Sequence, residues 1–245
     1  VLPKTMPKLT GYEVAGWSRA ADQTGGDIYD VIAKDGTVML LLGDATGHGI
    51  GPALSVTQVR AMLRIAVRLG AGLDDAFRHI NDQLADDLSS NRFVTAFLGV
   101  LDTTSHRLTY HAGGQGPILH YHAARGEASL AAATTLPMGM MPIFKPTAAR
   151  ESVVEPGDIV AAITDGIYEY ENPAGKMFGD QRVVQLVREE AGSSAETILH
   201  RIVDEVTAFA EGTKENAACF SHAIAFKLVA DCMIGRNEMA FRTIK

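Results

Sequence analysis

The fold of this chain is decided by residues 38–49, which read VMLLLGDATGHG. Five consecutive apolar residues predict a buried strand, and the Gly-Asp pair that follows places the end of that strand at the rim of a sheet. An aspartate is rarely left buried in such a place unless it is paired or bound to a metal ion. Asp44 is therefore the first candidate for a functional residue.

Two further acidic motifs repeat this arrangement. Residues 25–30 read GGDIYD, and residues 164–169 read TDGIYE directly after a predicted apolar strand. Carboxylates, backbone carbonyls and waters are the ligands that Mg²⁺ and Mn²⁺ prefer. Several aspartates of these motifs, if they converge, would hold two such ions and activate a water for attack on a phosphoryl group.

A single Asp-Gly pair is usually only a turn, and Lys34-Asp35-Gly36 is an example within this chain. Three motifs at predicted strand ends and turns favour a site instead. His48 lies between two glycines in the second motif and is a candidate catalytic residue, either as a general acid or as a group that orients the loop. The glycine-rich run at 113–116 is not followed by a predicted helix, which argues against a phosphate-binding loop.

The order of predicted elements favours an α+β fold, namely two packed antiparallel β-sheets flanked by α-helices. The helix predicted at 52–69 places Leu54, Val59 and Leu63 on its inward face, and its arginines are expected to be solvated or to meet an acidic partner. The predicted strands are 12–18, 28–33, 37–43, 93–101, 107–112, 118–122, 149–154, 158–164 and 221–229, and the predicted helices are 52–69, 74–88, 181–191 and 195–210.

Composition narrows the class of function. The chain has 245 residues and a formal net charge of −7, with no basic run, which argues against a nucleic-acid partner. Two cysteines without CxxC spacing predict a reducing compartment, the cytoplasm. No segment has the roughly 18 consecutive apolar residues of a membrane span. The chain begins without methionine or a signal-peptide pattern, so we expect a piece of a longer protein.

With these motifs in place, the chain resembles the bacterial branch of the protein phosphatase 2C superfamily that includes stage II sporulation protein E. The resemblance rests on GGDIYD, GDATGHG and TDGIYE in that order and covers about residues 10 to 228. It implies a linker at 1–10 from an upstream sensory or receiver domain, a phosphatase domain at 11–228 and a C-terminal tail at 229–245.

The resemblance also implies a site and an activity. Asp44 would bridge two Mn²⁺ or Mg²⁺ ions, joined by the carbonyl of Ala45, and Asp27 and Asp165 would complete the ligand shells. The implied activity is a serine/threonine phosphoprotein phosphatase whose substrate is a phosphorylated signalling protein, such as an anti-sigma-factor antagonist. A homodimer is left open.

Two departures from the family pattern bear on activity. An Asp-Asp pair normally precedes the last strand, whereas residues 215–222 read ENAACFSH, with Ala217-Ala218 or Ala218-Cys219 in its place. Gly-Gln-Gly-Pro at 114–117 replaces the usual Gly-His-Asn-Pro. The first departure leaves a second hypothesis open, a pseudophosphatase that binds or signals without turnover. A hydrolase of small phosphoesters is a third.

Overall fold

The computed structural model describes residues 2–19, 25–47, 49–89, 91–143, 148–210 and 227–230. The strands are β1 (Tyr12–Ala15), β2 (Asp27–Lys34), β3 (Thr37–Ala45), β4 (Val94–Asp102), β5 (Arg107–Gly113), β6 (Ile118–His122), β7 (Glu127–Ala131), β8 (Arg150–Val153), β9 (Ile159–Ala162) and β10 (Lys227–Ala230). The helices are α1 (Ile50–Leu69), α2 (Leu73–Asp87), α3 (Asp165–Tyr168), α4 (Asp180–Glu189) and α5 (Ala195–Ala210).

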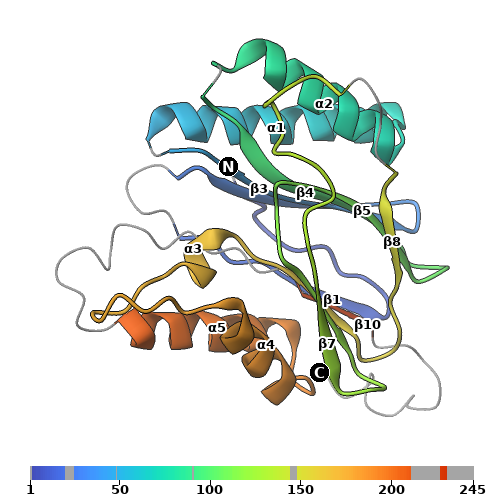
Figure 1. Cartoon of the computed structure of the whole chain (residues 1–245). Helices are drawn as coiled ribbons and strands as arrows, with labels where there is room; N and C mark the ends of the chain where they lie inside the picture. The colour runs from blue at the N-terminus through green and yellow to red at the C-terminus, as the bar shows by residue number, and fades with distance from the viewer. Residues whose placement is uncertain are drawn as a thin grey trace.

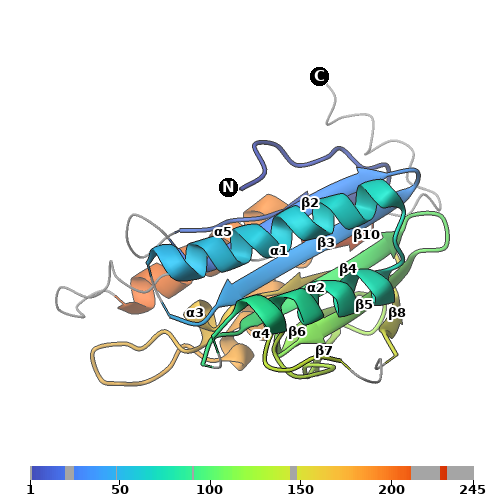
Figure 2. The same ribbon diagram turned by 90° about the horizontal axis from the view of Figure 1, so that it is seen from above.

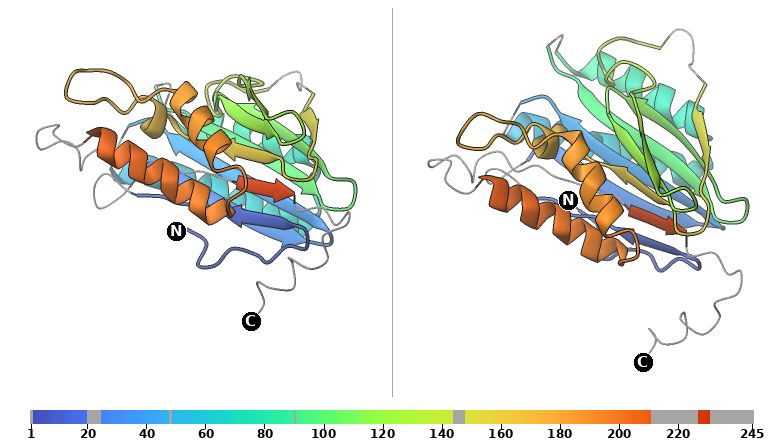
Figure 3. Two further views of the ribbon diagram at one scale, coloured as in Figure 1. Left: turned by 90° about the horizontal axis from the view of Figure 1, so that it is seen from below. Right: turned by 60° about the horizontal axis from the view of Figure 1, so that its bottom comes forward.

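These elements form four layers, with the two sheets in the middle (Figure 1). One sheet has the strand order β2-β3-β4-β5-β8 and the other β1-β10-β9-β6-β7, and every pairing is antiparallel. Helices α1 and α2 lie across the first sheet, as Figure 2 shows from above. Helices α4 and α5 cover the second sheet (Figure 3), with α5 against β1 and β10 and α4 against β6 and β7. The predicted sandwich of antiparallel sheets flanked by helices is confirmed.

The two-residue period of β3 divides its side chains between two cores. Val38, Leu40 and Leu42 face the second sheet and belong to the core between the sheets. Met39 and Leu41 face the other way and pack beneath α1 and α2. A third core lies between the second sheet and helices α4 and α5. Each interface between layers is thus filled from its own alternating set of apolar positions.

The arginines of α1 meet an acidic partner inside the chain. Asp30 lies on the helix-facing side of β2 with its side chain fully buried. Its carboxylate is 2.9 Å from Nε of Arg60 and accepts a 2.7 Å hydrogen bond from Arg64. Hydrogen bonding to Asp30 raises the pKa of Arg64. These ion pairs fix α1 over β2. Of the two alternatives for the arginines of this helix, an acidic partner holds for Arg60 and Arg64, and a fully solvated face does not.

The structure differs from the predicted elements in three further places. Residues 127–131, predicted to be irregular, form β7 against β6. Residues 165–168 form the short helix α3 rather than a plain turn. Leu54, expected on the inward face of α1, is 65% exposed. Among the described residues, no helix is both long and apolar enough to cross a membrane.

Removing the charge of Asp30 should destabilise the fold. In Asp30→Asn, Arg60 and Arg64 lose their counter-charge while remaining partly covered by α1 and β2. We expect the free energy of unfolding to fall by about 3 kcal/mol, the lower end of the cost of breaking a buried ion pair. Urea unfolding followed by circular dichroism measures this change.

Asp75→Asn is the matched control. Asp75 pairs with Arg78 at 3.3 Å on the exposed side of α2, where an ion pair contributes at most about 1 kcal/mol. Equal losses of stability in the two variants would contradict the structural role assigned to Asp30.

Candidate metal centre

Asp27 and Asp44 face each other across neighbouring strands. Asp27 begins β2, Asp44 is the penultimate residue of β3, and the two are cross-strand partners in the antiparallel register. Alternation places both on the side of the sheet that faces the other sheet, because Tyr29 and Leu42, two residues away along each strand, belong to the core between the sheets. Like charges directly opposite one another are destabilising in a sheet, so this pair favours a cation between them.

The backbone beside this pair leaves space for only a hydrogen atom on Gly26. A Cβ atom there would stand 2.8 Å from the carbonyl oxygen of Ala45 and 3.3 Å from Oδ1 of Asp44. A 3.0 Å hydrogen bond from the Ala45 amide to the Gly26 carbonyl joins the end of β3 to the residue before β2. Glycine therefore brings carbonyl and carboxylate oxygens close together, and hard oxygen donors of this kind fit Mg²⁺ or Mn²⁺.

Gln115 connects this edge to the opposite sheet. Its side chain is 3% exposed, and its Nε2 donates a 2.9 Å hydrogen bond to the carbonyl of Ile163, two residues before Asp165. The Thr95 hydroxyl is 3.4 Å from Oε1 of Gln115 and 3.3 Å from the carbonyl of Asp44, and can donate to either. Thr95 is the cross-strand partner of Asp44. This chain of contacts brings the third acidic motif to the edge that carries Asp44.

Tyr168 forms a second tie between the same segments. Its hydroxyl donates a 3.1 Å hydrogen bond to the carbonyl of Pro117, just after Gln115. Burial raises the pKa of Tyr168, and the nearby carboxylates of Asp180 and Asp165 raise it further. The hydroxyl therefore remains a donor across the ordinary pH range. Helix α3, which begins with the exposed Asp165, is held against the 113–117 loop from both ends.

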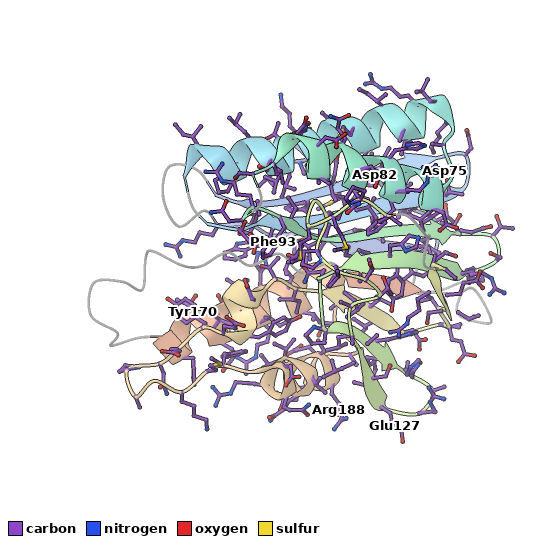
Figure 4. The ribbon with its side chains drawn as sticks, turned by 45° about the horizontal axis from the view of Figure 1, so that its top comes forward. Asp75, Asp82, Phe93, Glu127, Tyr170 and Arg188 are labelled. Carbon is purple, nitrogen blue, oxygen red and sulfur yellow. The ribbon has the colours of Figure 1, made fainter. Side chains whose placement is uncertain are left out.

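The loop that begins at Thr46 is hydrogen-bonded to Phe93, the residue before β4. The amide and hydroxyl of Thr46 donate to the carbonyl of Phe93 at 3.1 and 3.3 Å, and the Phe93 amide donates back to the hydroxyl at 3.2 Å. Figure 4 shows Phe93 and Tyr170, from the two halves of the sandwich, on the same side of the molecule. His48 and the 215–222 stretch lie outside the described residues.

Sequence reasoning missed Gln115 and Thr95. Gln115 stands in a glycine-rich loop directly after a strand, the context that singled out the aspartates. Because its amide carries no charge, the sequence marks it only within a discounted phosphate loop and as a departure from the family pattern. Thr95 is one of several threonines in strands and has no local signal. Only the strand register places it opposite Asp44.

Taken together, the residues form an acidic edge at the mouth of the sandwich. Asp27, Asp44 and the backbone of Ala45 come from adjacent strands, and the segment carrying Asp165 is tied to them by Gln115. An edge of this kind can bind divalent cations and, through them, a phosphate group. No serine or cysteine nucleophile is needed for such chemistry.

Known proteins resemble this chain over most of its length. Protein IcfG of Synechocystis is 26% identical over 242 residues, which cover 86% of this chain and 37% of that protein. Phosphoserine phosphatase RsbU of Bacillus subtilis is 21% identical over 207 residues, covering 84% and 61% of the two chains. This chain therefore spans less than two thirds of both curated relatives.

A solved structure shares the fold. The PP2C phosphatase domain of SpoIIE from Bacillus subtilis, solved with a fragment of its regulatory domain, superposes with a TM-score of 0.75 at 16% identity, covering 89% of this chain and 62% of that one. The family model described as stage II sporulation protein E (SpoIIE) matches residues 34–218, well over half of the chain. The chain therefore belongs to the stage II sporulation protein E family and has the protein phosphatase 2C-like fold.

Proposed function

We propose that this chain is a metal-dependent serine/threonine phosphoprotein phosphatase. The observation that carries the proposal is the facing pair Asp27 and Asp44 at the mouth of the sandwich, with the Asp165 segment tied to it through Gln115. A repulsive carboxylate pair beside a glycine cradle is suited to cations. The name of the relative RsbU, a phosphoserine phosphatase, supports the reaction class.

In this proposal the protein contributes positioning and charge. Asp27, Asp44, Asp165 and the carbonyl of Ala45 hold two Mn²⁺ or Mg²⁺ ions. Bound there, such ions lower the pKa of a coordinated water and neutralise charge on a phosphate. The rigid ties from Thr95, Gln115 and Tyr168 keep the acidic residues in place, because phosphoryl transfer depends chiefly on geometry and charge neutralisation. His48 is the candidate for proton transfer or loop orientation.

The proposed substrate is a phosphoserine or phosphothreonine on a small signalling protein, such as an anti-sigma-factor antagonist. We also propose that a sensory or receiver domain upstream of residue 10 controls the activity. We propose that the protein acts in the cytoplasm. A solved relative that contains part of a regulatory domain supports such control, and two cysteines without CxxC spacing support a reducing compartment.

A pseudophosphatase is the second candidate, and one observation favours it. Residues 215–222 contain no aspartate, although the family pattern expects an acidic pair there. Loss of one carboxylate would weaken one cation position while the remaining acidic edge stays in place. The chain would then bind a phosphorylated partner without turnover.

Asp44→Asn should abolish turnover and leave the fold intact. The substitution keeps the shape of the side chain, removes one negative charge and relieves repulsion with Asp27, so the melting temperature without added metal should stay equal or rise. We expect Mn²⁺-dependent hydrolysis of a phosphoserine peptide to fall by more than the roughly 100-fold that loss of an outer-shell partner costs. Asp75→Asn is the control, and full hydrolysis in Asp44→Asn would overturn the site.

Gln115→Glu tests whether the hydrogen bond from Gln115 to Ile163 positions the acidic residues. A carboxylate of the same size can still accept from Thr95 but cannot donate to the carbonyl of Ile163. We expect kcat to fall by roughly 10- to 100-fold and the Mn²⁺ concentration for half-maximal activity to rise, with little change in KM.

The control for this variant is Gln185→Glu on the exposed face of α4. An unchanged Mn²⁺ requirement in Gln115→Glu would show that the tie through Gln115 does not position the cations.

Ala218→Asp distinguishes the two candidate functions, because residue 218 falls within the missing pair in either register. If the chain is a phosphatase with a weakened cation position, the variant should lower the Mn²⁺ concentration for half-maximal hydrolysis by about tenfold. Ala208→Asp, at an exposed position of α5, is the control. Absence of turnover in both the original chain and Ala218→Asp, with both folded, would favour the pseudophosphatase.

A further inference from the structure

Two histidines and an aspartate meet at the end of the sandwich away from the acidic edge. His120 and His122 lie two residues apart on β6, so both rings extend from the same face of the strand. Asp158 directly precedes β9, which pairs with β6 through Tyr121 and Ile159, and this register places Asp158 beside His122.

The separation of this cluster from the acidic edge is visible in the side-chain view. Glu127 is the cross-strand partner of His122. Figure 4 shows Glu127 far from Phe93, which marks the acidic edge. Strand β6 runs from Ile118, near Gln115, to His122. The acidic edge and the histidine cluster therefore lie at opposite ends of this strand.

The distances within the cluster suit a metal ion bound by all three residues. Nε2 of His120 is 2.9 Å and Nδ1 of His122 is 3.7 Å from Oδ2 of Asp158. One ligand atom from each of the three residues lies within 4.8 Å of the others. Zinc–nitrogen and zinc–oxygen bonds of about 2.0–2.1 Å in a tetrahedral site put neighbouring ligand atoms roughly 3.3 Å apart. The two observed distances lie on either side of that value.

The second ring nitrogen of each histidine and both carboxylate oxygens of Asp158 contact other groups. The Ser152 hydroxyl is 3.0 Å from Nδ1 of His120, and the Ser129 hydroxyl is 3.4 Å from Nε2 of His122. The Asp158 carboxylate accepts two backbone N–H groups at 2.9 and 3.1 Å. Histidine ligands of metals characteristically have their second nitrogen fixed by an oxygen in this way. Nε2 of His120 is hydrogen-bonded to Oδ2 of Asp158, and a bound ion would replace that hydrogen bond.

The cluster is buried but can be reached. The Asp158 side chain is 1% exposed, and those of His120 and His122 are 10% and 23% exposed. A cavity of about 250 Å³ is lined by His120 and His122 together with Ser129, Ser152, Glu151 and Arg150, and Asp158 lies outside this lining. A buried carboxylate next to two imidazoles favours a cation, and the cavity gives access to the two histidines.

We propose that His120, His122 and Asp158 bind a divalent transition-metal ion of the Zn²⁺ class. Two imidazoles and one carboxylate are a donor set that such ions accept, whereas Mg²⁺ prefers oxygen ligands. This site is independent of the proposed phosphatase centre, because it shares no residue with the acidic edge.

The test uses the full chain carrying Asp44→Asn, which removes one carboxylate from the acidic edge. Zn²⁺ binding is measured by competition with a chromophoric chelator. We expect one Zn²⁺ per chain to bind, and His122→Ala to weaken that binding by at least about 100-fold, more than loss of an outer-shell partner costs. His200→Ala, exposed on α5, should leave binding unchanged.

Cobalt spectroscopy keeps the proposal testable if His122→Ala fails to fold. Co²⁺ added to the chain with its histidines intact should give the visible absorption of a four-coordinate nitrogen–oxygen site, and added Zn²⁺ should abolish it. Equal Zn²⁺ affinity in folded His122→Ala and His200→Ala would overturn the proposal. So would a sulfur-to-cobalt charge-transfer band, which would place the ion on Cys219 or Cys232, or the absence of any bound ion.

Discussion

Two carboxylates that face each other on neighbouring strands repel unless a positive charge lies between them, and the structure places Asp27 and Asp44 in that relation. The alternation of β2 and β3 directs both side chains to the mouth between the sheets. The same alternation sends Asp30 to the opposite face, where arginines of α1 neutralise it. Aspartates of one motif therefore lie in different places: Asp30 holds a helix in place, while Asp27 lies at the edge where we propose that cations bind.

Both sheets contribute residues to the acidic edge. The first sheet supplies Asp27, Asp44 and Thr95, and the second leads into Ile163 and Asp165. Gln115 spans the gap, and its buried amide exchanges hydrogen bonds with both sides. A buried amide is costly unless its hydrogen bonds are made, so the bridge constrains how the sheets close at this end. In this chain the 114–117 loop thus has a mechanical role.

Much of this arrangement could be predicted from the sequence because it is recorded locally. An apolar run followed by Gly-Asp indicates a strand that ends at a rim, and the helices follow from their own periods. What could not be predicted depends on register between distant segments. Strand β7 is weakly apolar and exists because β6 offers it an edge. Likewise, neither the pairing of Asp30 with Arg64, 34 residues away, nor the contact between Gln115 and Ile163 has a local signature.

The central claim is that the facing carboxylates hold divalent cations, and binding tests it more directly than turnover. The measurement is Mn²⁺ binding followed by electron paramagnetic resonance, with the original chain beside Asp27→Asn. The account predicts that the original chain sequesters Mn²⁺ and that Asp27→Asn, equally folded, binds it at least about tenfold more weakly. Identical binding curves for the two proteins would contradict it, because Asp27 would then contribute nothing to holding the ion.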